Sequence, residues 1–445
     1  MITFLIYKDN NGKRHAGLPP LDNSWVTNKT ANIDILQFRW IDKFIPKAYE
    51  DNYNFKTIDE IPPGEKYVIY LHIYESLTIE FKSDFKYIDP NNSRVSFPMP
   101  KRIWEDSGKG LVHWVFDHSP ETTLLHHVYS FEDFKAAFNI FDAKNMTMIS
   151  GIECNGRYGH MVKEECNEHG YNVITGYGFF GPWHLLCAWT SSENNRYVRT
   201  KIKNIFNNVP SKYKSVCYAR VPRHNKMLAT AYIFHHGLDK ESLFSLGVNI
   251  NDKLRYDNPK RKTNIDILKL SDKDLIKVYQ NLEASTELIY PHIREPDLDL
   301  TIDNPVQVIS KEHGYQSYFQ LTNETIIGDY TRYPFITEKS YKPFIMFQPF
   351  VMNGSLGCVQ VLKERGFDVF EKWIDHSYDS ISNNTKRWEK ALAEFKRLHE
   401  LPHDQWNIML REMLEGLIHN NNHVTRLPPR LIATQLFAIL IGFYH

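Results

Sequence analysis

The sequence is poor in cysteine, carries no net charge and has no long uninterrupted apolar run. Its five cysteines form no close pairs, and their odd number favours reduced thiols in a reducing compartment over a disulfide framework. The longest apolar run, residues 431–443, is interrupted by Thr434 and Gln435 and is too short to cross a bilayer. At the N-terminus a short apolar stretch precedes the basic residues, which is the reverse of a secretion signal. We therefore expect a cytoplasmic protein with no membrane partner.

The charge balance and the absence of a glycine-rich motif narrow the possible classes of protein further. The 53 basic and 53 acidic residues cancel, so no global field attracts nucleic acid, and such a partner needs a local basic patch. No G-x-G-x-x-G turn follows the first expected strand, which argues against a dehydrogenase or an epimerase. With 445 residues and 42% hydrophobic content, the chain is long enough for two globular domains.

One segment contains side chains that zinc binds, namely Cys154, His160, Cys166 and His169. Structural zinc sites usually begin with two ligands about two to four residues apart, and this spacing is absent here. We therefore predict no metal ligands in this segment.

Short β-rich runs alternate with amphipathic helical stretches. Residues 67–73, 111–116 and 146–151 have the pattern of buried strands, and residues 130–141 have that of a helix between two of them. This alternation predicts an α/β fold, in which helices cover parallel sheets.

Three regions follow from the pattern. We expect an N-terminal domain over residues 1–205 and a second domain over residues 211–380, because the polar, basic stretch 191–215 resembles an interdomain connection. Residues 381–445 are predicted to form helices that pack on the domain pair. Their apolar residues recur at helical spacing, which is typical of core packing. These are Trp388, Leu392, Phe395, Leu398, Trp406, Met409, Leu410, Met413, Leu414 and Leu417.

The second domain opens with two arginines where a strand passes into a helix. Residues 215–219 form the expected strand, Pro222 suits a helix start, and Arg220 and Arg223 lie between the two elements. A helix N-terminus at the carboxyl end of a strand favours phosphate, and neighbouring arginines strengthen this preference. A solvated basic loop is the alternative interpretation.

The segment FITEKSYKPF, residues 335–344, has the same layout. Thr337 is placed to cap a helix, and Pro343 is expected to limit it to little more than one turn. Glu338 and Lys339 then lie at the helix start, where a carboxylate can bind a ribose and an ammonium can neutralise a diphosphate. A surface ion pair with a helix cap is the alternative.

The residues after this segment add context. A strand at 349–352, a Gly-Ser-Leu-Gly turn at 354–357, a helix and then another short strand are predicted. The ordered run TEKSYKPF, QPFVMNGSLG, LKERGFDVF and IDHSYD resembles the carboxyl-terminal domain of viral and bacterial glycosyltransferases with two Rossmann-like domains, the GT-B fold. The Thr-Glu-Lys signature is similar to that of fucosyltransferase-type enzymes.

Two further segments share the resemblance, which covers about residues 211–380. CYARVPRHNK, residues 217–226, is similar to the arginine-rich turn of that group, although Ala219 and Asn225 depart from the pattern. QSYFQLTNET, residues 316–325, contains Glu324 and resembles the segment before the signature.

The resemblance implies a nucleotide-sugar donor bound without a cofactor or a metal. It implies that Arg220 and Arg223 contact the donor diphosphate, that Glu338 binds the ribose and that Lys339 supports the phosphates. Glu324 belongs to the same predicted site. Fixed cations and helix-end dipoles can stabilise the departing nucleoside diphosphate, so we expect metal-independent transfer.

The acceptor side needs a group that takes the proton of the hydroxyl. Asp117 and His118 follow the strand at 111–116, and Glu75 follows the strand at 67–73, so all three lie at carboxyl ends where ligands collect. We predict Asp117 as the base, with His118 and then Glu75 as alternatives. The alternative role of each of them is that of a turn or capping residue, because such residues commonly begin turns and helices.

The acceptor itself is a hypothesis drawn from the resemblance to viral enzymes. We suggest a hydroxymethylated pyrimidine in DNA, in the host cytoplasm if the protein is viral, with a glycan or a protein as the alternative. A non-catalytic sugar- or nucleic-acid-binding protein is the alternative of another class. Two basic clusters could contact phosphates, or could be solvated loops. They are Arg196, Arg199, Lys201 and Lys203, and Lys260, Arg261 and Lys262.

A base would have to leave the duplex for such a reaction. Phe179, Phe180 and Trp183 are the stacking candidates for it, and core or loop packing is their alternative role.

Overall fold

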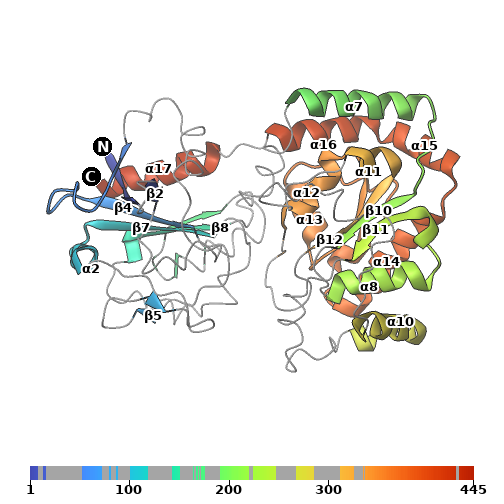
Figure 1. The fold of residues 1–445 in the computed structure, drawn as a ribbon, viewed down its shortest axis with the longest axis horizontal. Coiled ribbons are helices and arrows are strands. Elements are labelled where there is room, and N and C mark those ends of the chain that lie inside the picture. The colour runs from blue at the N-terminus through green and yellow to red at the C-terminus, as the bar shows by residue number, and fades with distance from the viewer. Residues whose placement is uncertain are drawn as a thin grey trace. The chain divides into compact units, whose positions relative to one another are not determined.

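The computed structural model describes residues 1–8, 14–16, 53–72, 80–81, 87–88, 101–118, 143–150, 164, 167–168, 170, 172–175, 191–219, 224–246, 267–284, 311–324, 334, 336–426 and 430–444. Over these residues the protein has an α/β fold with two mainly parallel sheets, as the alternating pattern predicts (Figure 1). The chain divides into two compact units. One comprises Met1–Phe179 and Pro428–His445, and the other comprises Phe180–Leu427.

The larger sheet lies in the first unit. Its parallel strands are ordered β3-β1-β4-β7-β8-β9, and β2 pairs with β1 in the antiparallel direction. The strands are β1 (Ile2–Lys8), β2 (Arg14–Ala16), β3 (Tyr53–Lys56), β4 (Tyr67–His72), β7 (Val112–His118), β8 (Met146–Ser150) and β9 (Asn172–Thr175). The predicted strands at 67–73, 111–116 and 146–151 are therefore confirmed, whereas the predicted helix at 130–141 lies outside the described residues.

Smaller elements complete the description of this unit. They are β5 (Glu80–Phe81) paired with β6 (Tyr87–Ile88), α2 (Lys101–Gly108) and a 3-10 turn at Ala143–Asn145. The core strand β4 is almost inaccessible to solvent from Tyr67 to Tyr70, as its continuous apolar sequence requires for a strand covered on both faces.

The last helix of the chain, α17 (Arg430–Tyr444), packs in the first unit against β1 and β9. The backbone N–H of Thr3 donates to the Tyr444 hydroxyl at 2.7 Å, and that hydroxyl donates to the carbonyl of Lys66 at 2.9 Å. The Lys66 ammonium lies 5.1 Å from the centre of the Phe443 ring. The two ends of the chain are thus joined within one unit.

The second unit contains a parallel sheet ordered β11-β10-β12-β13. Its strands are β10 (Ser215–Ala219), β11 (Ser242–Leu246), β12 (Phe319–Asn323) and β13 (Phe350–Asn353). Its helices are α7 (Ser191–Phe206), α8 (His224–His235), α10 (Lys273–Ala284), α11 (Lys311–Gln316), α12 (Glu338–Ile345), α13 (Cys358–Glu364), α14 (Asn384–Glu400), α15 (His403–Glu412) and α16 (Leu414–Arg426). Short 3-10 turns occur at Asp239–Glu241, Ile267–Lys269 and Ser377–Ser380.

The described strands of both sheets follow the same order. In each unit the first strand is central, the second parallel strand lies on one side of it and the later strands lie on the other. The chain therefore changes sides next to the first strand, between β1 and β4 in one unit and between β10 and β12 in the other. In open α/β sheets such a switch point leaves a crevice at the carboxyl ends of the strands, where ligands bind.

Residues 191–206 form helix α7, so the predicted connection at 191–215 is wrong over this range, and the helix belongs to the second unit rather than to residues 1–205. The stretch contains no glycine or proline before Pro210, and Tyr197, Lys201 and Ile205 recur every four residues. All three are at most 4% exposed, and the Tyr197 hydroxyl donates to the carbonyl of Met346 at 2.7 Å. A helix whose described buried residues form only such a narrow stripe has the polar composition of a connection.

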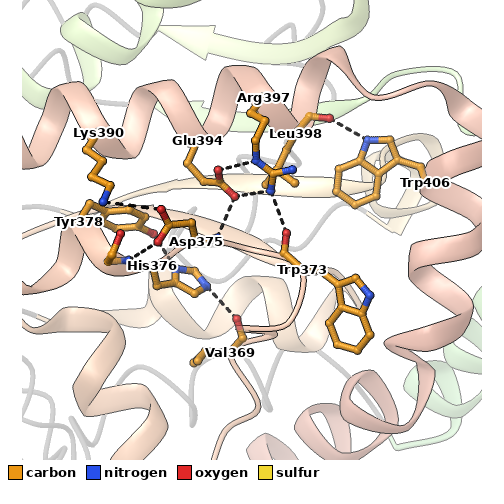
Figure 2. Close-up of polar contacts among 11 residues, drawn as sticks. Val369, Trp373, Asp375, His376, Tyr378, Lys390, Glu394, Arg397, Leu398 and Trp406 are labelled. Carbon is orange, nitrogen blue, oxygen red and sulfur yellow. Dashed lines mark hydrogen bonds and ion pairs between the residues drawn. The ribbon is translucent and has the colours of Figure 1, made fainter.

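The short strand predicted after the helix that became α13 is also wrong, because residues 365–383 contain no paired strand. Phe370 has a φ of 62°, a value that no regular strand contains. Asp368 is instead bonded to α16: its backbone N–H donates to Asn420 Oδ1 at 2.8 Å, and its carbonyl accepts from the Asn420 amide at 2.7 Å. Further along the chain, the guanidinium of Arg397 on α14 donates to the carbonyl of Trp373 at 2.8 Å and to Glu394 of the same helix at 2.6 Å, as Figure 2 shows. His376 contributes a further hydrogen bond to the carbonyl of Val369 at 2.8 Å.

The C-terminal helices are confirmed as core elements, and they divide between the units. Helices α14, α15 and α16 lie in the second unit and α17 lies in the first. The predicted apolar stripe is buried except at Leu414, which is half-buried. Trp406 stacks on Phe319 of β12 with ring centroids 4.9 Å apart, and its indole N–H donates to the carbonyl of Leu398 (Figure 2).

Within the described part of the chain, no helix combines the length and apolar character that a membrane crossing requires. The described cysteines, Cys217 and Cys358, are buried thiols, and burial raises the pKa of the Cys217 thiol to about 12.

Candidate functional site

The carboxyl ends of β10, β12 and β13 meet at one edge of the second sheet, and three buried asparagines join them. The Asn353 amide donates to Asn323 Oδ1 at 2.7 Å and to the carbonyl of Asn225 at 3.2 Å. The Asn225 amide in turn donates to the carbonyl of Glu324 at 2.5 Å. Asn225, Asn323 and Asn353 are at most 2% exposed. The start of α8 is therefore fixed to the ends of two neighbouring strands.

The side-chain oxygen of Asn353 is buried and has no hydrogen-bond partner among the described residues. Burying a hydrogen-bond acceptor without a partner costs about 1–3 kcal/mol of stability. This edge of the sheet therefore has a hydrogen-bond acceptor that the described part of the fold leaves unsatisfied. The sequence pattern alone does not single out Asn323 and Asn353. The available signal was an asparagine directly after the expected strand at 349–352 and another at the end of the β-rich run 318–323.

Asn225, one of the two residues that differ from the arginine-rich turn of the glycosyltransferases that the sequence resembles, has a structural role. It occupies the first turn of α8 and connects this helix to the residue that follows β12. Ala219, the other departure, is fully buried at the end of β10, and its backbone N–H donates to Ser245 at 3.4 Å.

Glu324 lies beneath the start of α12. Its carboxylate accepts hydrogen bonds from the Thr337 backbone N–H at 3.0 Å, from the Thr337 hydroxyl at 2.7 Å and from the Ser340 hydroxyl. The residue is 0% exposed, so the protein itself supplies these donors and the carboxylate does not face solvent. Glu324 therefore holds in place the helix start that carries the Thr-Glu-Lys signature.

The helix start itself has the predicted cap. The Thr337 hydroxyl accepts from the Lys339 backbone N–H at 3.4 Å and from the Lys339 ammonium at 3.2 Å. Glu338 and Lys339 are the first two residues of α12, and Lys339 is half-buried. The side chain of Glu338 lies outside the described residues. Both residues are thus positioned at a helix N-terminus, where partial positive charge favours anions.

The predicted length of α12 is wrong. The helix continues through Pro343 to Ile345. Proline at this position removes one backbone donor, and the buried apolar residues Phe344 and Ile345 secure the last turn through packing. The N–H of Met346 still closes the helix by donating to the carbonyl of Lys342 at 2.8 Å.

Arg220 and Arg223 lie outside the described residues, but the elements on either side of them are described. Ala219 ends β10 and His224 begins α8, so the connection that contains both arginines starts at the carboxyl end of the central strand. The His224 ring nitrogen lies 2.6 Å from the Tyr279 hydroxyl, which fixes the beginning of α8 against α10.

In the first unit, Asp117 and His118 are the last two residues of β7. Asp117 is in register with His72 of β4 and with Ile149 of β8, and His118 is in register with Ser150. His72 is thus a further titratable residue at this edge, which the sequence analysis counted only as part of a strand. Glu75 lies outside the described residues.

His113 lies deeper in the same strand and is a core residue. It is 1% exposed, its Nε2 lies 2.8 Å from the Thr147 hydroxyl, and burial lowers its pKa to about 4. The ring is therefore neutral near pH 7 and separate from the acid–base candidates at the carboxyl edge.

The basic cluster on α7 differs from its prediction at one residue. Arg196, Arg199 and Lys203 are exposed, but Lys201 is 4% exposed and donates to the carbonyl of Ser317 at 3.1 Å. Burial lowers the pKa of Lys201 to about 7. Lys201 is therefore excluded as a surface contact for phosphates, and this part of the prediction is wrong.

Several other predicted residues lie outside the described residues. These are Cys154, His160, Cys166, His169, Phe179, Phe180, Trp183, Lys260, Arg261 and Lys262.

No protein-family model matches the chain, and no curated protein matches it significantly. The motifs and the geometry at the carboxyl ends of the two sheets are therefore the basis for a proposed function.

Proposed function

We propose that the protein is a GT-B-type glycosyltransferase that moves a sugar from a nucleotide-sugar donor to a hydroxyl group. The observation that carries this proposal is the attachment of the Thr337–Glu338–Lys339 helix start to the switch point of the second sheet through the buried Glu324. An isolated surface ion pair would not need a fully buried carboxylate beneath it. A preorganised anion site does need such support, because its donors must be fixed before the ligand arrives.

The donor half of the site combines three sources of positive charge. Lys339 and the N-terminus of α12 lie on one connection, and Arg220 and Arg223 lie on the connection between β10 and α8. Together they would neutralise the nucleoside diphosphate as it departs, while Glu338 would accept hydrogen bonds from the ribose. This chemistry would need no bound metal or organic cofactor.

The acceptor half uses the carboxyl edge of the first sheet. Asp117 would take the proton of the attacking hydroxyl, and His118 or Glu75 would be the alternative base. The register of Asp117 with His72 supports this choice, because it adds a second proton-accepting residue at the same edge.

A hydroxymethylated pyrimidine in DNA is the acceptor that we propose, with a glycan or a protein as the alternative. The support is a basic stripe on α7: Arg196, Arg199 and Lys203 recur at intervals of three and four residues, so they share one helix face, and all three are exposed. Such a stripe can contact successive phosphates, and its affinity for DNA would fall as salt rises.

Calorimetry with nucleoside diphosphates tests the donor site. Lys339→Ala should weaken diphosphate binding by roughly ten- to a hundredfold, since a charge-assisted hydrogen bond contributes about 1.5–3 kcal/mol. Lys386→Ala is the matched control, because Lys386 is an exposed lysine in the first turn of α14 of the same unit, and this variant should bind normally. If wild type and Lys339→Ala bind nucleoside diphosphate with equal affinity, the proposed donor site is contradicted.

A panel of acceptors tests the other half. Hydroxymethylated DNA, unmodified DNA and free saccharides are offered with a set of nucleotide sugars, and mass spectrometry reads the added sugar. Sugar found only on hydroxymethylated DNA supports the proposed acceptor. Mass added only to a saccharide contradicts the DNA proposal but leaves the glycosyltransferase proposal intact, whereas binding without transfer favours a non-catalytic module.

A further inference from the structure

Two histidines and an aspartate form a cluster where the end of α8 meets the start of α10. The ligating atoms of His235, His236 and Asp272 all lie within 4.8 Å of one another. His235 Nε2 is 2.9 Å from Asp272 Oδ2, and the two imidazole rings lie 4.7 Å apart. All three residues are half-buried, and α10 packs directly against α8 (Figure 1).

The carboxylate of Asp272 is held in position by its second oxygen. Asp272 Oδ1 accepts from the backbone N–H groups of Asp274 at 3.0 Å and Leu275 at 2.9 Å, so it caps the N-terminus of α10. Oδ2 is thereby directed toward the histidines. Metal sites commonly fix their ligands through outer hydrogen bonds of this kind, which orient the ligating atom in advance.

The electrostatic surroundings favour a cation. His235 is the last residue of α8, a helix of 12 residues, and the C-terminal end of a helix carries partial negative charge. On the neighbouring helix α14, Glu400 and Lys396 form an ion pair at 3.7 Å and both act on His236, so their charges largely offset each other there. Asp272 then supplies the unbalanced negative charge of the cluster.

We propose that His235, His236 and Asp272 bind a divalent transition-metal ion, best matched by Zn²⁺, with water completing a tetrahedral site. Imidazole nitrogen and carboxylate oxygen ligands select zinc over magnesium or calcium, which prefer oxygen alone. Bond lengths of about 2.0–2.2 Å in a tetrahedral site place the ligating atoms roughly 3.3 Å apart. His235 Nε2 and Asp272 Oδ2 lie 2.9 Å apart and all the ligating atoms lie within 4.8 Å of one another, so small side-chain rotations can bring them to that spacing.

This ion would fasten α10 to the end of α8. The cluster is separated from Asn225, at the other end of α8, by ten residues, or about 15 Å of helix. A structural ion here is independent of the proposed donor site, and its presence or absence leaves that proposal unaffected.

Zinc binding by the full chain, after treatment with a chelator and dialysis, tests the proposal. Calorimetry should detect a zinc site in the wild type that weakens at least tenfold in His236→Ala and in Asp272→Asn. Asp272→Asn is a discriminating variant, because asparagine also caps helices and therefore preserves the start of α10. His419→Asn removes an exposed histidine outside the cluster and should leave the site unchanged.

Cobalt provides a second readout, because its spectrum reports the ligand type. The bound ion should show the visible bands of tetrahedral Co²⁺ without a thiolate-to-metal charge-transfer band, and Asp272→Asn should weaken those bands. Equal zinc affinity in wild type, His236→Ala and Asp272→Asn would overturn the proposal. So would the absence of any zinc binding by the wild type, or a thiolate band that locates the ion on cysteines.

Discussion

The most informative single change is the replacement of Glu324, the buried carboxylate beneath the start of α12. Glu324→Ala removes the acceptor of three hydrogen bonds, namely those from the Thr337 N–H, the Thr337 hydroxyl and the Ser340 hydroxyl. Glu324→Gln retains the size of the side chain and one carbonyl oxygen, but it replaces the other oxygen with an amide donor. Ser340→Ala removes only one of the three donors.

The magnitudes follow from the number of bonds lost. At about 1 kcal/mol for each net hydrogen bond, Ser340→Ala should destabilise the region by roughly 1 kcal/mol and Glu324→Ala by roughly 3–5 kcal/mol, the cavity included. Glu324→Gln should fall between them, at about 1–3 kcal/mol. Its new amide group meets the Thr337 hydroxyl, which already accepts from the Lys339 N–H and ammonium.

Hydrogen exchange measured by mass spectrometry on peptides that span residues 336–346 is the appropriate assay. It reports local opening free energies, so it does not require the two units to unfold together. Exchange of the α12 amides should accelerate in the order Ser340→Ala, Glu324→Gln, Glu324→Ala, with diphosphate affinity falling in the same order. Unchanged exchange in Glu324→Ala would refute the claim that this carboxylate fixes the helix start.

Two further predictions concern the acceptor edge and the buried lysine. Asp117→Asn should lower the rate of sugar transfer by about 10²–10⁴-fold, while its donor affinity, measured by calorimetry, stays within twofold of the wild type. If this variant transfers sugar as fast as the wild type, the base is instead His118 or Glu75. The pKa of Lys201 falls from 10.5 to about 7 on folding, so between these two pH values the unfolded chain binds one more proton than the folded protein does. The free energy of unfolding should therefore rise with pH across that window, by up to about 1.4 kcal/mol per pH unit. Urea unfolding of wild type and Lys201→Met at several pH values checks this, since the substitution should remove that component of the slope; parallel curves for the two proteins would contradict it.

The sheets of the fold were predictable where strands are apolar along their whole length. The strand at 215–219 has the predicted bounds, and those at 67–72 and 146–150 differ from prediction by one residue, because continuous burial gives a strong local signal. The stretch at 367–370 is also largely apolar, but the left-handed conformation of Phe370 is incompatible with a regular strand, and the backbone of Asp368 bonds to Asn420 of α16. That outcome depends on residues distant in the sequence, which local patterns do not encode.

The helix start of the candidate site was predictable from the sequence, whereas the buried residues that support it were not. Thr337 as a cap follows from local chemistry, and the structure has that cap. The support from Glu324 and from the asparagines depends on the strand order β10-β12-β13, which brings together residues about 100 positions apart, such as Asn225 and Glu324. A similar limit applies to Lys201, because only the packing of α7 distinguishes it from the exposed Arg199.

The most direct test of the central claim is release of nucleoside diphosphate from a panel of nucleotide sugars, with sugar transfer to hydroxymethylated DNA or a saccharide measured in the same reaction. We predict that the wild type consumes at least one donor and transfers its sugar, and that Lys339→Ala loses most of this activity while Lys386→Ala retains it. If no donor in the panel is consumed, or if Lys339→Ala is as active as the wild type, the assignment of the second unit as a nucleotide-sugar site is contradicted.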